Sequence, residues 1–302
     1  ELKPNALDAN TTASNNTAVG FNSLTLTTEG GSNTALGSNS LASNTTGSNN
    51  TAVGRYALQD NTTGIYNTAV GWIALGDNIT GNSNTAVGMY SLRANTASEN
   101  TALGYKAMYV NTTGTQNVAV GNNALDANTS GSYNTTVGML SLTALTTGAQ
   151  NTTMGYASGQ GLTGASSFNV AIGDETMLTA GEKSYNTAVG SDAMRATTTG
   201  SNNVAVGYDS LKSNTTGAQQ VAVGGSAMLA NTTGYNNTAV GWESMKANTE
   251  GALNVAVGQQ AMLANTTGDK NVCVGHNSLA ANTTADNNTA IGDNAMAANT
   301  TG

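Results

Sequence analysis

The chain has 302 residues, of which only 9% are charged and 5% are aromatic, and its formal net charge is −8. Its nine Lys and Arg residues are scattered singly, so no basic stripe can neutralise a run of phosphates, which argues against nucleic-acid binding. The single cysteine, Cys273, excludes an intrachain disulfide framework. No stretch approaches about 18 consecutive apolar residues, so we expect no membrane insertion.

One short polar phrase, close to Asn-Thr-Ala-Val-Gly, recurs along the chain. Its closing glycines are 17 residues apart, except for 16 between Gly88 and Gly104 and 18 between Gly155 and Gly173. A fixed period is typical of repeat proteins, in which each unit packs on its neighbours. We interpret residues 1–302 as a single repeat array, with a partial first repeat at 1–13 and an irregular repeat at 156–173. The closing glycines are Gly20, Gly37, Gly54, Gly71, Gly88, Gly104, Gly121, Gly138, Gly155, Gly173, Gly190, Gly207, Gly224, Gly241, Gly258, Gly275 and Gly292.

Each repeat has two short apolar segments separated by two turns. One segment ends at the closing glycine, the other surrounds a small residue followed by Leu or Met, and an Asn-Thr-Thr-Gly phrase forms the second turn. A unit of 17 residues is too short for a pair of helices but long enough for two short strands. The pattern predicts an all-β fold, a parallel β-solenoid or β-roll of about 17 coils with one coil per repeat.

The positions of the repeat suggest roles within a coil. The aliphatic residue before the glycine, such as Val53, and the Leu or Met four residues after it, such as Leu58, are predicted to point inward as two anchors. The small residues nearby would allow close backbone approach, across a thin core or to a second chain. The glycine is expected to take a positive φ at a corner. The asparagine that opens each phrase is expected to form a ladder with its copies in neighbouring coils.

Two inward anchors per repeat make a thin core. Burial of one Val and one Leu stabilises a coil by only about 3–6 kcal/mol, so a lone roll would be marginal. We expect several chains to associate through the alanine-lined face, as a homotrimeric fibre, as end-to-end filaments or as both. This argument favours association but does not distinguish three chains from two.

The phrases SNNTAVG (48–54), SNNVAVG (201–207) and SFNVAIG (167–173) resemble the YadA-like head repeats of trimeric autotransporter adhesins, whose unit is shorter. The 17-residue form, NTAVGxxALxxNTTG, also resembles the shaft repeats of tail-fibre proteins. The resemblance covers nearly the whole chain. It implies a trimeric β-roll that is extracellular, on a cell surface or on a virion surface. It leaves the ligand open, with host or surface glycans among the candidates.

Three features that can mark an active site are interpreted as structural. His276 is the only histidine and has no neighbouring Cys, Asp or Glu cluster, so we expect a surface side chain and no metal, cofactor or catalytic centre. Cys273 replaces the usual alanine in NVCVG and is expected to be a small buried side chain. The segment GQGLTG, residues 159–164, matches a dinucleotide-binding pattern but opens no helix, so we predict a local bulge.

The Asn-Thr-Thr phrase is also an acceptor sequence for N-linked glycans. Its copies fall on the same turn of successive repeats, so glycans would form a column along the array. The alternative is that Asn and Thr simply suit turns and ladders. The candidate acceptors are Asn10, Asn44, Asn61, Asn78, Asn111, Asn128, Asn214, Asn231, Asn265, Asn282 and Asn299.

The two positions after each glycine vary most, which indicates a solvent-facing corner. Aromatic rings at this corner would contact glycans or partner filaments; the alternative is that the corner is simply unconstrained. The candidates for an exposed aromatic corner are Trp72, Tyr105, Tyr208 and Trp242.

Three classes of function fit these observations. The leading one is a structural surface fibre without catalytic activity, as an adhesin head, a fibre shaft or a filament subunit. The second is an ice-binding β-solenoid, although the paired Thr residues of the Asn-Thr-Thr phrase are not plainly a flat T-x-T strand. The third is a carbohydrate-binding or carbohydrate-cleaving fibre, in which Asp174, Glu175 and Asp192 would approach one another on adjacent coils.

Overall fold

A computed structural model describes residues 6–300, which form two compact units divided between Gln150 and Asn151. Residues 1–5 of the partial first repeat lie outside the described residues. In the part described, every closing glycine follows one strand of three residues. The first unit contains β1 (Thr17–Val19), β2 (Thr34–Leu36), β3 (Thr51–Val53), β4 (Thr68–Val70), β5 (Thr85–Val87), β6 (Thr101–Leu103), β7 (Val118–Val120) and β8 (Thr135–Val137). The second contains β9 (Thr152–Met154), β10 (Val170–Ile172), β11 (Thr187–Val189), β12 (Val204–Val206), β13 (Val221–Val223), β14 (Thr238–Val240), β15 (Val255–Val257), β16 (Val272–Val274) and β17 (Thr289–Ile291).

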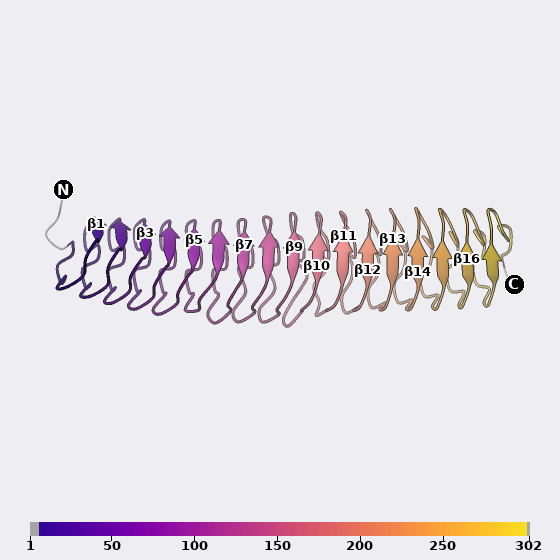
Figure 1. The fold of residues 1–302 in the computed structure, drawn as a ribbon. Helices are drawn as coiled ribbons and strands as arrows, with labels where there is room; N and C mark the ends of the chain where they lie inside the picture. The colour runs from indigo at the N-terminus through magenta and orange to yellow at the C-terminus, as the bar shows by residue number, and fades with distance from the viewer. Residues whose placement is uncertain (1–5, 301–302) are drawn as a thin grey trace. The chain divides into compact units, whose positions relative to one another are not determined.

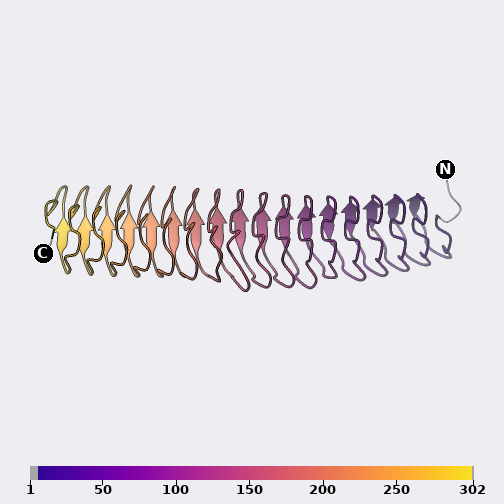
Figure 2. The ribbon, with the colours of Figure 1, turned by 180° about the vertical axis from the view of Figure 1, so that it is seen from behind.

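Within each unit, every strand pairs in parallel with the strand of the next coil. The register is strict: Ala35 of β2 lies opposite Ala52 of β3, and Ala205 of β12 lies opposite Ala222 of β13. Figure 1 shows the arrows of each unit side by side and pointing the same way. The view from behind in Figure 2 shows the loops that carry the chain from one strand to the next. The predicted all-β parallel solenoid, with one coil per repeat, is therefore confirmed in both units, but the second short strand expected around the Leu or Met of each repeat is a turn in the described coils.

We number the positions of a coil from 1 to 17, beginning at the asparagine before the strand. In coil 33–49, for example, Asn33 is position 1, the strand is positions 2–4 and Gly37 is position 5. Leu41 is then position 9 and Asn44 is position 12. The same numbering applies to each regular coil.

The core differs from the sequence-based prediction at one position. Leu or Met at position 9 is buried as predicted in all regular coils but the last, and the small residue at position 8 is buried beside it, as Leu58 and Ala57 show. The aliphatic residue at position 4, however, points outward: Leu36 is 48% exposed, whereas Ala35 beside it is fully buried. Successive side chains of a strand point to opposite faces, so only one of these two positions can face inward. The narrow coil takes the methyl group of alanine and leaves the larger side chain outside. The alanine-lined face is therefore inside the coil and is not the contact between chains that the sequence suggested.

The glycine at position 5 forms a corner that only glycine fits. Its φ lies between 127° and 144° in the described coils, as predicted from the sequence. A Cβ atom on Gly71 would lie 2.6 Å from the carbonyl oxygen of Gly88 in the next coil. The corner therefore needs glycine both for its backbone conformation and for the close stacking of coils.

Three further positions of the coil have left-handed backbone without glycine. In coil 33–49 these are Asn39 (φ 58°), Leu41 (φ 50°) and Asn49 (φ 60°), at positions 7, 9 and 17. Left-handed backbone is uncommon for residues other than glycine and is strained for bulky side chains. Its recurrence at the same positions shows that the stacked hydrogen bonds of the roll determine the turn shape.

The asparagine at position 1 forms the ladder predicted from the sequence. The side chain of Asn33 is fully buried, its Oδ1 accepts the backbone N–H of Asn50 at 2.9 Å, and its Nδ2 donates to the carbonyl of Gly47 at 2.9 Å. The amide thus joins neighbouring coils on one side and spans its own coil on the other. In the second unit, Gln220 takes the same place, and its Oε1 accepts the backbone N–H of Asn237.

The irregular repeat contains a local rearrangement, as predicted for GQGLTG. Gly159 takes the left-handed position usually held by Leu (φ 66°), Leu162 is fully buried, and an isolated bridge joins Leu162 to Gly181. In the following coil Lys183 replaces the glycine of the turn. Its side chain is buried, and Nζ donates to the carbonyls of Thr179 at 2.6 Å and Thr197 at 2.5 Å.

Candidate functional site

Positions 2 and 4 of each coil form an outward surface that we call the strand face. Position 4 is always Val, Leu, Ile or Met, and position 2 is Thr or Val, so positions 2–4 carry no charge in any described coil. Their side chains are partly or largely exposed, with Val19 at 47% and Val206 at 37%. Each unit therefore presents an uncharged face with one aliphatic side chain per coil.

The composition of the strand face differs between the units. In the first unit position 2 is Thr in six successive strands, β1 to β6, whereas in the second unit Val is the commoner residue there. The threonines of the Asn-Thr-Thr phrase are placed differently. At position 13 the hydroxyl is used within the roll, because Thr45 Oγ1 donates to the carbonyl of Thr62 at 3.1 Å. A row of threonines is thus on the strand face at position 2, and not in the Asn-Thr-Thr turn.

The asparagine at position 12, the predicted glycan acceptor, forms a second ladder inside the coil. Asn61 Nδ2 donates to Asn44 Oδ1 at 2.9 Å and to the carbonyl of Gly64 at 3.1 Å, and Asn61 Oδ1 accepts from Asn78 at 2.9 Å. An N-linked glycan is joined to that same Nδ2 atom, so the folded coil has no room for one. The fully buried acceptors are Asn44, Asn61, Asn78, Asn111, Asn128, Asn214, Asn231, Asn265 and Asn282.

The two remaining candidate acceptors lie near the ends of the described chain. Asn10 is exposed, with its Oδ1 accepting the backbone N–H of Ala13, and Asn299 is half-buried. The predicted column of glycans along the array is therefore incompatible with the folded coils. At the nine buried sites, Asn is present for the ladder.

The exposed aromatic corner is where the sequence placed it. Trp72, Tyr105, Tyr208 and Trp242 are all exposed. Only in the first unit, among the described residues, do corner rings join a larger group. We call this group, Trp72, Tyr90, Arg93, Tyr105, Lys106 and Tyr109, the aromatic–basic cluster.

The cluster is built from three successive coils. The rings of Trp72 and Tyr90 lie 4.9 Å apart between centroids with a 48° tilt, and Tyr90 meets Tyr109 edge-on at 5.9 Å. The guanidinium of Arg93 lies 5.9 Å from the ring of Tyr90 and 5.8 Å from that of Tyr109, and donates to the Tyr109 hydroxyl at 2.8 Å. Lys106 Nζ lies 5.3 Å from the ring of Tyr109. Sequence reasoning missed Arg93 and Tyr109, because only stacking of the coils brings position 10 beside the corner rings.

A network of charged side chains crosses three coils of the second unit. Arg195 contacts Glu175 at 2.7 Å and Asp192 at 3.4 Å, and Lys212 contacts Asp192 at 3.1 Å and Asp209 at 2.8 Å. The hydrogen bond to Asp209 raises the pKa of the Lys212 ammonium. Glu175 and Asp192 are thus brought together as the sequence suggested, but both are bound to Arg195. Asp174 is exposed and takes no part in this network of ion pairs.

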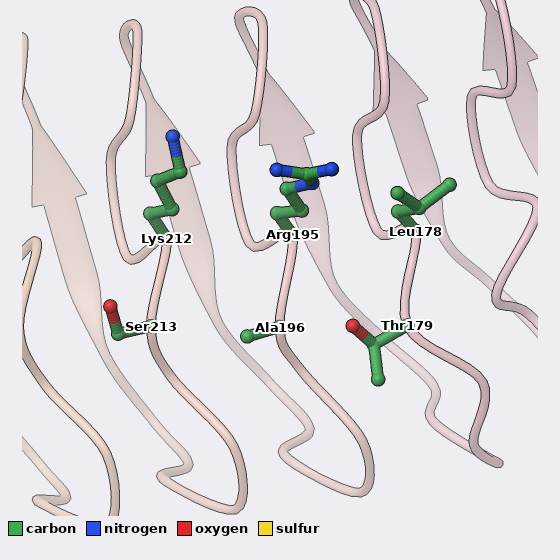
Figure 3. Close-up of a pocket in the computed structure, with 6 residues that line it drawn as sticks. All are labelled: Leu178, Thr179, Arg195, Ala196, Lys212 and Ser213. Atoms are coloured by element: carbon green, nitrogen blue, oxygen red, sulfur yellow. The ribbon is translucent and has the colours of Figure 1, made fainter.

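A shallow depression of about 430 Å³ lies beside this network. Figure 3 shows Leu178, Arg195 and Lys212 along one side of it and Thr179, Ala196 and Ser213 along the other, each pair from one coil. The small side chains at position 11 leave the space, and the cations at its edge already have carboxylate partners. Equivalent positions of successive coils line the depression. Its lining contains no acidic or basic side chain without an ion-pair partner.

His276 and Cys273 take the structural places expected of them. His276 is half-exposed, and its Nδ1 lies 2.9 Å from Asp293 Oδ1 in the next coil. Cys273 is fully buried in the alanine column at position 3, and this burial raises the pKa of its thiol to about 12. Residues 6–300 contain no group of three His, Cys, Asp or Glu side chains placed to hold a metal ion. The same residues form no helix of the length and apolarity needed to cross a membrane.

No protein-family model, no curated protein and no solved structure matches this chain.

Proposed function

We propose that the chain is a structural module of a surface fibre that associates with copies of itself through the strand face. The observation that carries this proposal is the exposed aliphatic column at position 4, which has no charged neighbour on the strand. Monomeric soluble proteins rarely expose extended apolar patches, and such patches mark interaction surfaces. Here the patch is repeated in every coil of both units.

A second copy of this chain is the occupant that the strand face fits best. The face repeats once per coil, at the strand spacing of about 4.8 Å. A partner with the same repeat would meet each aliphatic side chain with an equivalent one. The resemblance to trimeric adhesin heads and tail-fibre shafts favours three copies around one axis, in an extracellular setting on a cell or virion. As an adhesin head, shaft or filament subunit, the module would have a mechanical role and no catalytic one.

Cross-linking tests whether the strand face is the contact. In a Cys273→Ala background, Val70→Cys places a thiol on this face and Thr63→Cys places one on the exposed turn of the preceding coil. With a short bismaleimide, we expect covalent pairs of chains for Val70→Cys and almost none for Thr63→Cys. Equal cross-linking of the two variants would contradict the proposal.

Ice binding is a second candidate, favoured by one observation. The six successive threonines at position 2 of β1 to β6 form a regular outward row in the first unit. Such a row could order water only if the strand face stays free of partner chains. Thermal hysteresis that is lost in Thr51→Tyr would support ice binding, whereas unaltered ice growth with the wild-type protein would exclude it.

A further inference from the structure

We propose that the aromatic–basic cluster of the first unit binds an acidic saccharide, meaning a sugar that carries a carboxylate or a sulfate group. The cluster lies at positions 6, 7 and 10, past the corner glycine and away from positions 2 and 4. The two surfaces share no residue, so the proposal does not depend on association through the strand face.

The rings supply the apolar half of such a site. Trp72 and Tyr105 are exposed, at 40% and 37%, and Tyr90 extends the ring of Trp72 at 4.9 Å. The C–H groups on one side of a sugar ring pack on an aromatic face, while the hydroxyl groups at its rim bind to polar atoms nearby. The Tyr hydroxyls and the Asp77 carboxylate provide those polar atoms. Binding sites for small molecules commonly combine aromatic walls with a few placed polar groups in this way.

The cations supply the charged half of the site. In an acidic protein, every basic residue described in the first unit contacts a tyrosine ring: Arg55 lies over Tyr56, while Arg93 and Lys106 share Tyr109. Arg93 has one acidic neighbour, Asp77, at 3.8 Å from its Nε, so most of its donors are not taken by a carboxylate. Arginine offers a planar set of donors that suits carboxylate and sulfate groups.

The stacking of coils gives the cluster a direction. Trp72, Tyr90 and Tyr109 come from three successive coils, about 4.8 Å apart. This spacing is close to the repeat of one sugar unit in an extended chain. An oligosaccharide lying along the coils would meet an aromatic ring at each step and would bring its acid groups to Arg93 and Lys106.

Binding to immobilised probes tests the proposal. The acidic probes are hexameric galacturonate, sialyllactose and a heparin hexasaccharide, and the neutral controls are the carboxyl-reduced galacturonate and lactose. We expect at least one acidic probe to bind more tightly than the neutral controls. We also expect Trp72→Ala and Arg93→Gln each to weaken that binding about tenfold, with Arg93→Lys retaining part of it. A response to carboxylated probes alone, or to sulfated probes alone, identifies the acid group.

The matched control is Trp242→Ala, which removes an indole that is also exposed, at 52%, from position 6 of a coil in the second unit. It should leave binding unchanged. Circular dichroism and a melting curve for each variant show that it is folded. Equal binding of acidic and neutral probes, no binding of any acidic probe, or full binding by the folded Trp72→Ala and Arg93→Gln variants would overturn the proposal.

Discussion

At the scale of single residues, buried amides help to stabilise the inside of the coil, as apolar side chains do in most protein cores. Away from the terminal coils, the asparagines at positions 1 and 12 are buried, and each one bonds to the next coil or across its own coil. A buried polar group is costly unless it is hydrogen-bonded, and a ladder satisfies most of its members through identical neighbours. The Oδ1 atoms of Asn78, Asn128 and Asn282 are buried without a hydrogen-bond partner. The polar phrase recurs along the chain because each buried amide needs an equivalent amide in the neighbouring coil as its partner.

The ladder at position 12 predicts a large cost for a small change. Asn61→Ala removes three hydrogen bonds, to Asn44, Asn78 and Gly64. The buried Oδ1 of Asn44 loses this donor, while the Gly64 carbonyl and Asn78 Nδ2 each keep one other bond. We expect a loss of about 3 kcal/mol in the free energy of unfolding. The exposed Thr63→Ala in the same turn should change it by less than about 0.5 kcal/mol. Denaturant unfolding measures both, and equal stability of the two variants would contradict the ladder.

Lys183 predicts an unusual dependence of stability on pH. Loss of hydration lowers the pKa of its buried ammonium to about 8, from the ordinary value of 10.5. Between these values the unfolded chain binds more protons than the folded chain, so stability rises with pH across this window. Below about pH 8 the penalty for burying the charge is fully present.

Comparison with Lys183→Met isolates this effect. Relative to that variant, the wild-type free energy of unfolding should rise by about 3 kcal/mol between pH 7.5 and 10.5. Lys246, which pairs with Glu243 near the surface, serves as the control, and Lys246→Met should show no such rise. If the difference in the free energy of unfolding between wild type and Lys183→Met stays constant with pH, burial does not lower the pKa of Lys183.

At the scale of the element, the coil is determined by its corners as much as by its core. The strand has only three residues, and the chain turns at position 5 with a backbone that glycine alone adopts readily. The glycine also packs closely against the carbonyl of the corner glycine in the next coil, which leaves no space for a Cβ atom. Conformation and stacking therefore both constrain this position.

Two substitutions separate these constraints. Gly71→Ala introduces both the strained backbone and a clash with Gly88, so we expect a loss of more than about 3 kcal/mol. Gly292→Ala has the same strain, but its new Cβ would meet nothing closer than Ala295 Cβ at 3.9 Å. A loss of about 1–3 kcal/mol is expected there. Similar losses for both variants in thermal or denaturant unfolding would mean that coil stacking contributes little.

The sequence predicted the repeat and its first strand well. It was wrong in placing a second short strand around position 9, where the described coils form a turn, and in directing the aliphatic residue of position 4 inward. The period, the parallel pairing, the corner glycine and the first asparagine ladder all follow from spacing, because a solenoid repeats its local geometry. Spacing does not show which residue of the strand faces inward, because neighbouring side chains point to opposite faces. Hydrophobicity alone would place Val inside. The width of the coil settles the choice, and this width depends on turns with left-handed Leu and Asn that the sequence does not reveal.

The candidate site was harder to predict than the fold. Trp72 and Tyr105 stand out as variable corner residues, but Arg93 and Tyr109 join them only through stacking of position 10 in neighbouring coils. The glycan acceptors illustrate the opposite error. Their motif is genuine at the level of sequence, but burial gives the same Asn and Thr a structural task.

At the scale of the whole molecule, the outward position of Val strengthens the case for association. Most coils keep Ala, a second small residue and Leu or Met inside, which is a thinner core than one containing Val. The larger side chains at position 4 are placed where they can be buried only by a partner. Association would therefore bury apolar surface that the coil itself leaves in water, which is a stabilising change.

Native mass spectrometry of three proteins tests this account most directly. These are the wild type, the strand-face variant Val53→Glu/Val70→Glu, and the control Thr46→Glu/Thr63→Glu, which adds the same charge at position 14, where Glu29 and Glu250 occur naturally. We predict three times the chain mass of 30.2 kDa for the wild type and the control, and a single folded chain for the strand-face variant. A single-chain wild type, or a strand-face variant that still assembles, would contradict the account.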